Sequence, residues 1–483
     1  MSRFAGMVRG TILSGGGMIF SMLGGMVVWK VVTQSPVLTE AEVGIFALLL
    51  ICTDTFVIVN NFGIRTALPK LIAAATGEEK ARLTGSALAY QALISLGCGA
   101  VFVLAWIAIP RDATPADDDS WRTLLPWLWA LAPLGFVATM RELLLAALAG
   151  HQAYTRRAVG LAALALLYGG TVAGCVWWLR GGLLLLILAT VAAHGLAMVV
   201  LYLLLPTGRR LNLHWASFTE GVRFAWPLYL NNLFTIVQAK LDTVIVAALM
   251  GTHVAALFEI GAKKLPQYAT SILGAALIPF LPGISERIAL HDEQGALDLL
   301  RLAYSIFAYL GYAAVFAVQL LEVPLILVLF SPEYLEGTNA LGLMMAATVM
   351  ALQAGIMGQT LLALGRPHLI TVVNVGLAVI SLGLNALLIP LYGMVGAGVA
   401  SVAAVLFSLV MQMWWVRRSG LALPWEVFLK PQLLFAGCIL LVLMPGPAWL
   451  GRGLALAAFA GGGFALRIIT LSQVRSALFS LRT

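Results

Sequence analysis

The sequence predicts an all-α fold, a polytopic membrane protein with about 14 transmembrane helices. Of the 483 residues, 61% are hydrophobic and 10% are charged, whereas soluble domains carry about 25% charged residues. The mean hydropathy is +0.97, and the apolar residues fall in runs that fit helical spans of about 20 residues. This composition excludes a soluble enzyme, a disordered scaffold and a disulfide-rich secreted module. The length of the runs also excludes an outer-membrane barrel.

The expected spans are the apolar runs of about 18 residues or more. The first run is too long for a signal peptide and has no small-residue cleavage site, so we expect it to be kept as a span. The ninth run is long enough to be tilted or broken near Pro324. In chain order the expected spans are 9–31, 43–64, 84–109, 124–148, 158–179, 182–205, 223–250, 254–281, 302–330, 338–363, 368–390, 393–416, 428–445 and 449–471.

The basic residues indicate how the chain crosses the membrane. Eighteen Lys and Arg residues fall on one side of the expected spans, and only Arg111, Arg122, Arg180 and Arg452 fall on the other. Because cytoplasmic loops are enriched in Lys and Arg, both termini are expected in the cytoplasm. The net charge of +8 is scattered singly between apolar runs, so it does not indicate a nucleic-acid partner.

Two stretches of the sequence repeat. Residues 43–73 align with 254–283, and residues 144–152 align with 361–368, at offsets near 210. An even number of spans in each repeat makes the two halves parallel repeats, related by an axis along the membrane normal. We therefore expect a six-helix bundle over 1–210, a second six-helix bundle over 211–420, and two additional transmembrane helices over 421–483.

Polar side chains inside the apolar runs are costly, because a charge at the centre of a bilayer costs at least about 2.5 kcal/mol. In three spans these residues recur at helical spacing on one face, so we expect the stripes to face one another or water in a cavity between the two bundles. The stripes are Asp54, Asn61 and Arg65 in the second span; Asn231, Thr235, Gln238 and Asp242 in the seventh; and Glu259, Lys263 and Gln267, with Lys264 beside them, in the eighth.

Lysines dominate the deepest part of this expected lining. Lys263 and Lys264 lie about 15 Å from the outer end of their span, and the single nearby acid, Glu259, cannot neutralise both. Lys30 and Lys240 occupy near-equivalent places in the two halves. Ammonium groups can replace the lost hydration of phosphate, so the pattern favours an anionic ligand.

Structural interpretations of the same residues stay open. Lys30 could instead extend its ammonium to the outer interface, and Arg141 with Glu142 fits a structural pair better than a ligand contact. Asp242 and Glu259, on helices joined by a short loop, fit a structural lock as well as a proton or cation site.

The sequence contains no nucleotide, metal or catalytic motif. There is no GxxxxGK[ST] motif, no metal-ligand spacing and no Ser/His/Asp arrangement. The four cysteines lie far apart inside apolar runs and are expected to be small buried hydrophobes. His194 and His214 are isolated in the sequence. We therefore expect neither an enzyme nor a metal site nor a bound cofactor.

Two segments resemble a known family. LTEAEVGIFALL followed by NNFGIRTALPKLIA resembles the second-span signature of bacterial polysaccharide flippases, and LALGRPHLITVVNVGLAVISLGLNALLIPLYGMVGAGVAS resembles the eleventh and twelfth spans. These flippases belong to the multidrug/oligosaccharidyl-lipid/polysaccharide exporter superfamily. The acidic residue that often precedes FG in the second span is Asn61 here, which weakens the case for a coupling role at that position.

The resemblance implies a carrier that moves an undecaprenyl-pyrophosphate-linked oligosaccharide across the bacterial inner membrane by alternating access. It implies the lipid-linked glycan and membrane lipid as partners, together with a polysaccharide polymerase and chain-length machinery, and possible proton or sodium coupling. The alternatives are a lipid II flippase, a cation-coupled multidrug exporter and, less favoured, a membrane-embedded glycosyltransferase. We expect the substrate to be bound by Lys263, Lys264, Lys240, Lys30, Arg65, Asn231, Gln238 and Gln267, and coupling or gating to use Asp242, Glu259 and Asp54.

Overall fold

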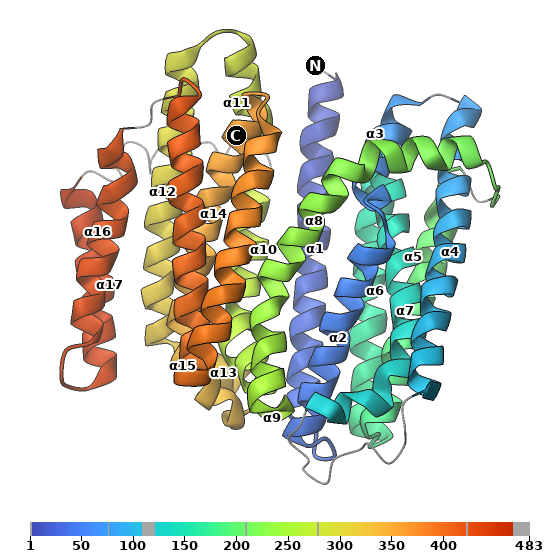
Figure 1. Cartoon of the computed structure of the whole chain (residues 1–483), viewed down its shortest axis with the longest axis horizontal. Helices are drawn as coiled ribbons and strands as arrows, with labels where there is room; N and C mark the ends of the chain where they lie inside the picture. The colour runs from blue at the N-terminus through green and yellow to red at the C-terminus, as the bar shows by residue number, and fades with distance from the viewer. Residues whose placement is uncertain are drawn as a thin grey trace. The chain divides into compact units, whose positions relative to one another are not determined.

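The computed structural model describes residues 2–75, 77–108, 121–207, 210–277, 280–421 and 424–466. Within these ranges the chain forms helices and no strand (Figure 1), which confirms the all-α class. Nine helices of the described part are long and apolar enough to cross a membrane. One of them, α15 (Pro367–Arg418), joins two helices across a kink at Gly393. The polytopic class is therefore confirmed, and the number of spans stays a prediction.

The chain divides into two compact units, Met1–Glu259 with Leu329–Ser331, and Ile260–Val328 with Pro332–Thr483. The division expected near residues 210 and 420 stays a prediction. The helices of the first unit are α1 (Ser2–Thr33), α2 (Glu40–Asn60), α3 (Ile64–Ala74), α4 (Gly77–Ala108), η2 (Trp121–Ala130), α5 (Leu131–Gly150), α6 (Tyr154–Ala173), η3 (Gly174–Trp178), α7 (Leu183–Leu204), α8 (Trp215–Met250) and α9 (Thr252–Leu257).

Local sequence signals set the ends of the helices in the first unit. A capping box starts α2, since the Thr39 side chain accepts from the backbone N–H of Glu42 at 3.3 Å and the Glu42 carboxylate accepts from that of Thr39 at 2.9 Å. Phe62 and Gly63, with φ of 48° and 76°, form the turn between α2 and α3. A Cβ on Gly63 would lie 2.8 Å from the Ala225 carbonyl oxygen. Glycine is therefore required both by conformation and by space.

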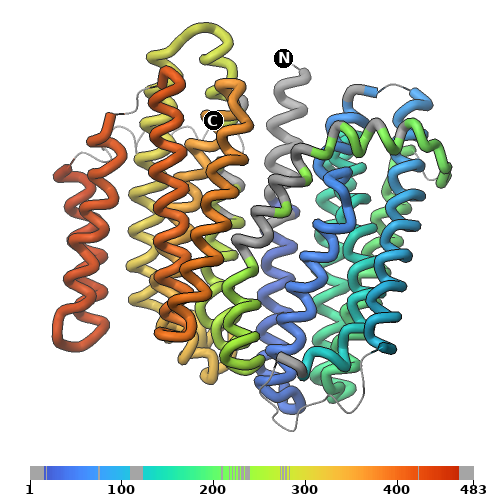
Figure 2. The backbone as a smooth tube through the Cα atoms, viewed as in Figure 1, coloured from blue at the N-terminus to red at the C-terminus, as the bar shows by residue number. Residues whose placement is uncertain are grey.

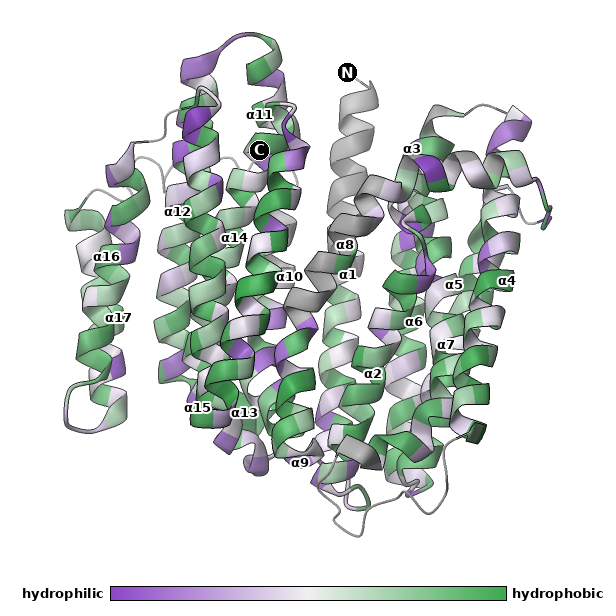
Figure 3. Ribbon diagram, in the orientation of Figure 1, coloured by the Kyte–Doolittle hydropathy of each residue, from purple (hydrophilic) through white to green (hydrophobic). Residues whose placement is uncertain are grey.

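The core of the first unit is built where α3 and α5 pack together, with α4 against α5. Leu68 and Ile72 of α3 and Leu143 and Leu148 of α5 are at most 2% exposed. Hydropathy changes along the helices of each unit, with hydrophilic residues gathered toward several helix ends and apolar residues between them (Figure 3). This is the pattern of helices that cross an apolar slab.

The second unit begins in a π-helical segment, η4 (Phe258–Lys263). The expected break near Pro324 is confirmed, because α12 ends at Leu320 and a new helix starts at Glu322. At the α15 kink Gly393 has φ of 59° and ψ of −138°, which favours glycine. The other helices are α10 (Lys264–Ala276), α11 (Phe280–Ala289), α12 (Glu293–Leu320), α13 (Glu322–Leu329), η5 (Pro332–Ala340), α14 (Leu341–Ala363), α16 (Trp425–Val442) and α17 (Ala448–Ala465).

The last two helices, α16 and α17, form a hairpin that packs on α12 (Figure 2). Aromatic rings fill the contact, since Tyr312 of α12 stacks on Phe435 of α16 at 4.2 Å between ring centroids. A polar network lies beside them. The Tyr304 hydroxyl donates to Gln353 Oε1 at 3.0 Å, and Gln432 Nε2 donates to the same oxygen at 2.7 Å. These bonds connect α12, α14 and α16.

Candidate functional site

Four ionisable side chains from three segments gather in the first unit, and we call them the lysine–carboxylate cluster: Asp54, Lys240, Asp242 and Glu259. Lys240 Nζ lies 3.6 Å from Asp54 Oδ2. Glu259, Asp54 and Asp242 all act electrostatically on Lys240. Asp242 and Glu259 are 3% and 1% exposed. The structure thus brings one expected ligand residue together with all three expected coupling carboxylates.

Thr243 links the two buried carboxylates of this cluster. Its hydroxyl donates to Glu259 Oε2 at 3.0 Å, and its backbone N–H donates to Asp242 Oδ1 at 2.7 Å. The chain reverses at Gly251, with φ of 92°, so that the segment after α9 returns alongside α8. The sequence placed Asp242 and Glu259 on neighbouring helices, but it did not indicate that Thr243 contacts both.

Lys30 lies near the end of α1 in the same unit. Its ammonium donates to the Phe330 carbonyl oxygen at 2.9 Å, while Ser331 Oγ donates to the Thr33 carbonyl oxygen at 2.6 Å. These bonds attach the short segment Leu329–Ser331 to the first unit. Lys30 therefore has a structural backbone contact in addition to the ligand role expected for it.

Arg65 belongs to a second charged group, which we call the arginine–glutamate cluster: Arg65, Arg141, Glu142 and His194. Each oxygen of the Glu142 carboxylate meets one guanidinium, Arg141 at 2.8 Å and Arg65 at 3.3 Å. Arg141 Nη1 lies 3.2 Å from His194 Nε2. His194, isolated in the sequence, is therefore the buried end of a network whose other end, Arg65, is 46% exposed. No sequence spacing reveals a contact between residues so far apart.

Asn61 lies next to this cluster in the chain and has a structural role. Its side-chain oxygen accepts from the backbone N–H of Arg65 at 2.6 Å, in the first turn of α3. The first backbone N–H groups of a helix have no acceptor within the helix, and a side-chain oxygen can supply one. This bond accounts for an amide at this position without a role in coupling.

Lys263 is the last residue of η4 and Lys264 is the first residue of α10, in the second unit. They are 5% and 8% exposed, and Lys264 Nζ donates to Gln267 Oε1 at 3.3 Å. A Cβ on Gly261 would lie 2.5 Å from the Tyr334 carbonyl oxygen, so η4 packs backbone to backbone against η5. Single π turns occur often at functional sites. Here the π turn ends at Lys263, and the α-helix begins at Lys264.

The remaining expected residues fall outside what the structure describes. The side chains of Asn231 and Gln238, in α8, are not among the described side chains. Among the described residues, no group of three His, Cys, Asp or Glu side chains could hold a metal ion.

One buried network of amides and a hydroxyl was not predicted from the sequence. In it, Asn60 Nδ2 donates to Ser95 Oγ at 3.1 Å, and the Gln91 side chain donates to Asn60.

Comparison with known proteins places the chain in a family. Residues 7–285 match the family described as polysaccharide biosynthesis protein. No curated protein matches the sequence. The fold, with its many apolar helices, is that of a polytopic membrane protein. The chain belongs to the polysaccharide biosynthesis protein family.

Solved structures support the same fold. An inward-facing multidrug resistance MATE family transporter of the MOP superfamily has a TM-score of 0.63 at 14% identity, covering 83% of this chain and 95% of that one. The outward-facing form of a MATE family transporter has a TM-score of 0.59 at 14% identity, covering 86% and 95%. A MOP superfamily transporter from Pyrococcus furiosus has a TM-score of 0.57 at 13% identity, covering 86% and 96%. At these identities the likeness establishes the fold.

Proposed function

We propose that this protein is a flippase for undecaprenyl-pyrophosphate-linked oligosaccharides, acting by alternating access in the bacterial inner membrane with both termini in the cytoplasm. The family supports a role in polysaccharide biosynthesis, and the fold supports a transporter. The finer substrate assignment depends on the lysines. The polymerase and chain-length machinery are proposed partners, because the translocated repeat units must be assembled afterwards.

The observation that carries this proposal is the pair of buried ammonium groups of Lys263 and Lys264. Removing an ammonium from water is costly unless other groups compensate it. Two adjacent ammonium groups suit a diphosphate, which presents several oxygens and more than one negative charge. Gln267, already bonded to Lys264, adds an amide that can serve phosphate or sugar oxygens.

We further propose that the lysine–carboxylate cluster couples transport to a cation, either a proton or sodium. Carboxylates buried in membrane helices commonly mark ion or proton pathways. Asp242 and Glu259 share Thr243, so a change at one carboxylate reaches the other through a single hydroxyl. Asp54 is exposed and pairs with Lys240, so water can replace Asp54 as the partner of the Lys240 ammonium.

A cation-coupled multidrug exporter is the second candidate, because the similar solved structures include multidrug resistance transporters. A pocket for cationic drugs favours acidic and aromatic linings over buried lysines. A lipid II flippase would share the diphosphate chemistry and differ in the glycan. Complementation separates the three: polysaccharide export, peptidoglycan synthesis and drug susceptibility are measured in strains lacking the corresponding native carrier.

The direct test in cells is the double variant Lys263→Gln/Lys264→Gln. We expect polysaccharide export to be abolished while the folded protein stays in the membrane. Lys430→Gln is the matched control, because Lys430 is an exposed lysine paired with Glu426 on α16. Normal export by the double variant would contradict the proposed substrate binding. If the double variant loses polysaccharide export but leaves drug susceptibility unchanged, the result supports a flippase over a multidrug exporter.

A further inference from the structure

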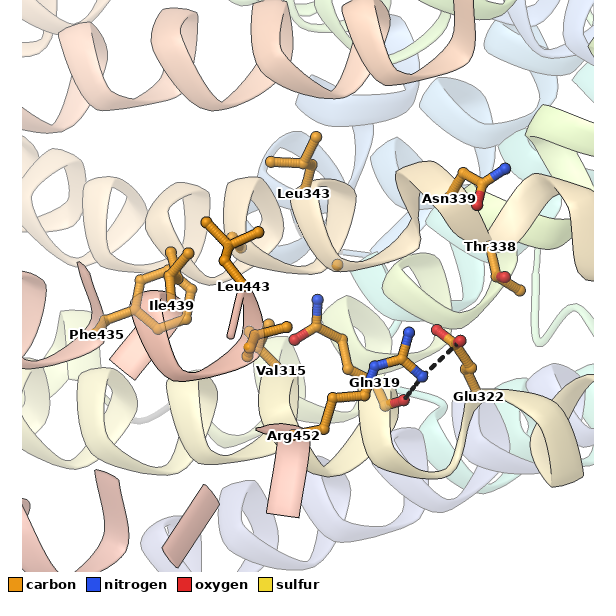
Figure 4. Close-up of a pocket in the computed structure, with 13 residues that line it drawn as sticks. Val315, Gln319, Glu322, Thr338, Asn339, Leu343, Phe435, Ile439, Leu443 and Arg452 are labelled. Carbon is orange, nitrogen blue, oxygen red and sulfur yellow. Dashed lines mark hydrogen bonds and ion pairs between the residues drawn. The ribbon is translucent and has the colours of Figure 1, made fainter. Parts of the chain in front are cut away.

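A cavity of about 350 Å³ lies within the second unit (Figure 4), in the size range of small-molecule sites. One end is polar and the other is apolar. The polar end is formed by α12, α13, η5 and α17, and the apolar end by α12, α14 and α16. The polar lining is Gln319, Glu322, Thr338, Asn339 and Arg452, and the apolar lining includes Val315, Leu343, Phe435, Ile439, Val442 and Leu443.

One cation and one anion face each other at the polar end. Arg452 Nη1 lies 2.7 Å from Glu322 Oε1 and donates to the Gln319 carbonyl oxygen at 3.0 Å. Their side chains are 24% and 12% exposed, so both remain reachable from the cavity. Across the described residues, the Gln319 and Asn339 side-chain amides make no hydrogen bond. The polar end thus offers two opposite charges and two available amides.

The apolar end leads to a surface suited to lipid tails. Phe435 is 5% exposed, whereas Ile439 on the same face of α16 is 37% exposed and Leu443, one residue past the end of α16, is 73% exposed. Because α16 is long and apolar enough to cross a membrane, its exposed apolar residues are placed to meet acyl chains. The cavity therefore connects a buried charged pair to a lipid-facing surface, which is the layout of an amphipathic ligand site.

We propose that this cavity binds a phospholipid with a zwitterionic phosphoethanolamine headgroup. The phosphate lies against Arg452, the ammonium against Glu322, and one acyl chain along Phe435, Ile439 and Leu443. The site carries one charge of each sign, so it complements a zwitterion. An anionic lipid would bring a second negative charge beside Glu322, at a cost in affinity. The Gln319 and Asn339 amides bond the phosphate and ester oxygens.

A bound lipid would also bridge the α16–α17 hairpin to the rest of the second unit, because its contacts come from both. This consequence goes beyond transport, and it does not depend on which glycan the protein carries. The thermal stability of the purified protein should therefore rise on adding the preferred lipid, by mass action.

The test uses the purified, delipidated full chain and native mass spectrometry with defined lipids. We expect phosphatidylethanolamine to bind better than phosphatidylglycerol and phosphatidylcholine, whose choline group cannot donate a hydrogen bond to Glu322. Glu322→Gln should shift the preference toward phosphatidylglycerol. Arg452→Gln should weaken binding about tenfold or more, the effect of losing a charge-assisted hydrogen bond.

Two further arms keep the proposal falsifiable. The double variant Glu322→Gln/Arg452→Gln keeps two hydrogen-bonding side chains and should lose headgroup selectivity without unfolding, while Glu426→Gln/Lys430→Gln on α16 should leave selectivity unchanged. Equal binding of phosphatidylglycerol by the wild-type chain, or unchanged selectivity in Glu322→Gln, would overturn the proposal. Binding of soluble phosphoethanolamine as tight as that of the lipid would also overturn it, by identifying a water-soluble ligand.

Discussion

The ammonium of Lys240 lies 3.6 Å from the carboxylate of Asp54, but the two side chains are buried unequally, 19% against 61% exposed. Removing the buried partner should cost more. We expect Lys240→Gln to destabilise the protein by about 1–3 kcal/mol, because it also removes a cation that interacts electrostatically with the buried Asp242 and Glu259. Asp54→Asn should cost less than about 1 kcal/mol. Thermal unfolding of the two purified variants makes the comparison, and equal losses would contradict it.

Thr243 is expected to be sensitive to loss of its hydroxyl. Thr243→Val keeps the shape but leaves Glu259 without this donor, at an expected cost of about 1–3 kcal/mol. Thr243→Ser should retain most of the stability and any cation dependence of transport. The check is a melting curve and an initial rate for each variant. A Val variant as stable as the Ser variant would show that the bond contributes nothing.

The hairpin α16–α17 should loosen when its polar link to α12 and α14 is cut. Gln432→Leu leaves Tyr304 and the buried Gln353 with fewer partners, so we expect a loss of about 1–3 kcal/mol. Hydrogen exchange should speed up in α16 first, because local opening starts where contacts have been removed. An exchange pattern that rises uniformly across the chain would argue against a local anchor.

His151, in the turn between α5 and α6, should make stability depend on pH. Burial, with a smaller contribution from the nearby Lys80, lowers the pKa of His151 in the folded protein. The unfolded state therefore binds the proton more readily. The stability from neutral His151 is present above the unfolded-state pKa of about 6.5 and is lost as the pH falls from there through the folded-state pKa.

The variant His151→Gln should flatten this dependence. Melting temperatures measured between pH 5 and pH 8 would show a smaller drop in acid for the variant than for the wild-type chain. Parallel curves for the two proteins would assign the acid sensitivity to other groups.

Features that depend on the overall composition or on a few neighbouring residues could be predicted from the sequence. The composition determined the membrane class, and Pro324 located the break between α12 and α13. Each of these is a property of a few neighbouring residues or of the whole composition. The sequence could therefore show them without knowing which helices meet.

Contacts between helices were not predictable in the same way. Helical spacing put Asp54 on a polar face, and Lys240 was expected at a place equivalent to that of Lys30, but neither pattern showed that the two side chains meet. It also gave no partner for His194, which reaches Arg141 from another helix. Many apolar helices have equivalent surfaces, so periodicity identifies a face and leaves its neighbour open. The substrate residues themselves stay predictions for the same reason.

Binding of an undecaprenyl-pyrophosphate-linked oligosaccharide to the purified protein tests the central claim most directly. The wild-type chain and the Lys263→Gln/Lys264→Gln variant are compared at fixed salt, with the diphosphate-linked lipid and with its neutral glycan alone. Losing two charge-assisted contacts should lower the affinity for the diphosphate-linked lipid about a hundredfold or more. The weak binding of the free glycan should stay unchanged. Equal affinity of both proteins for the diphosphate lipid would contradict the account.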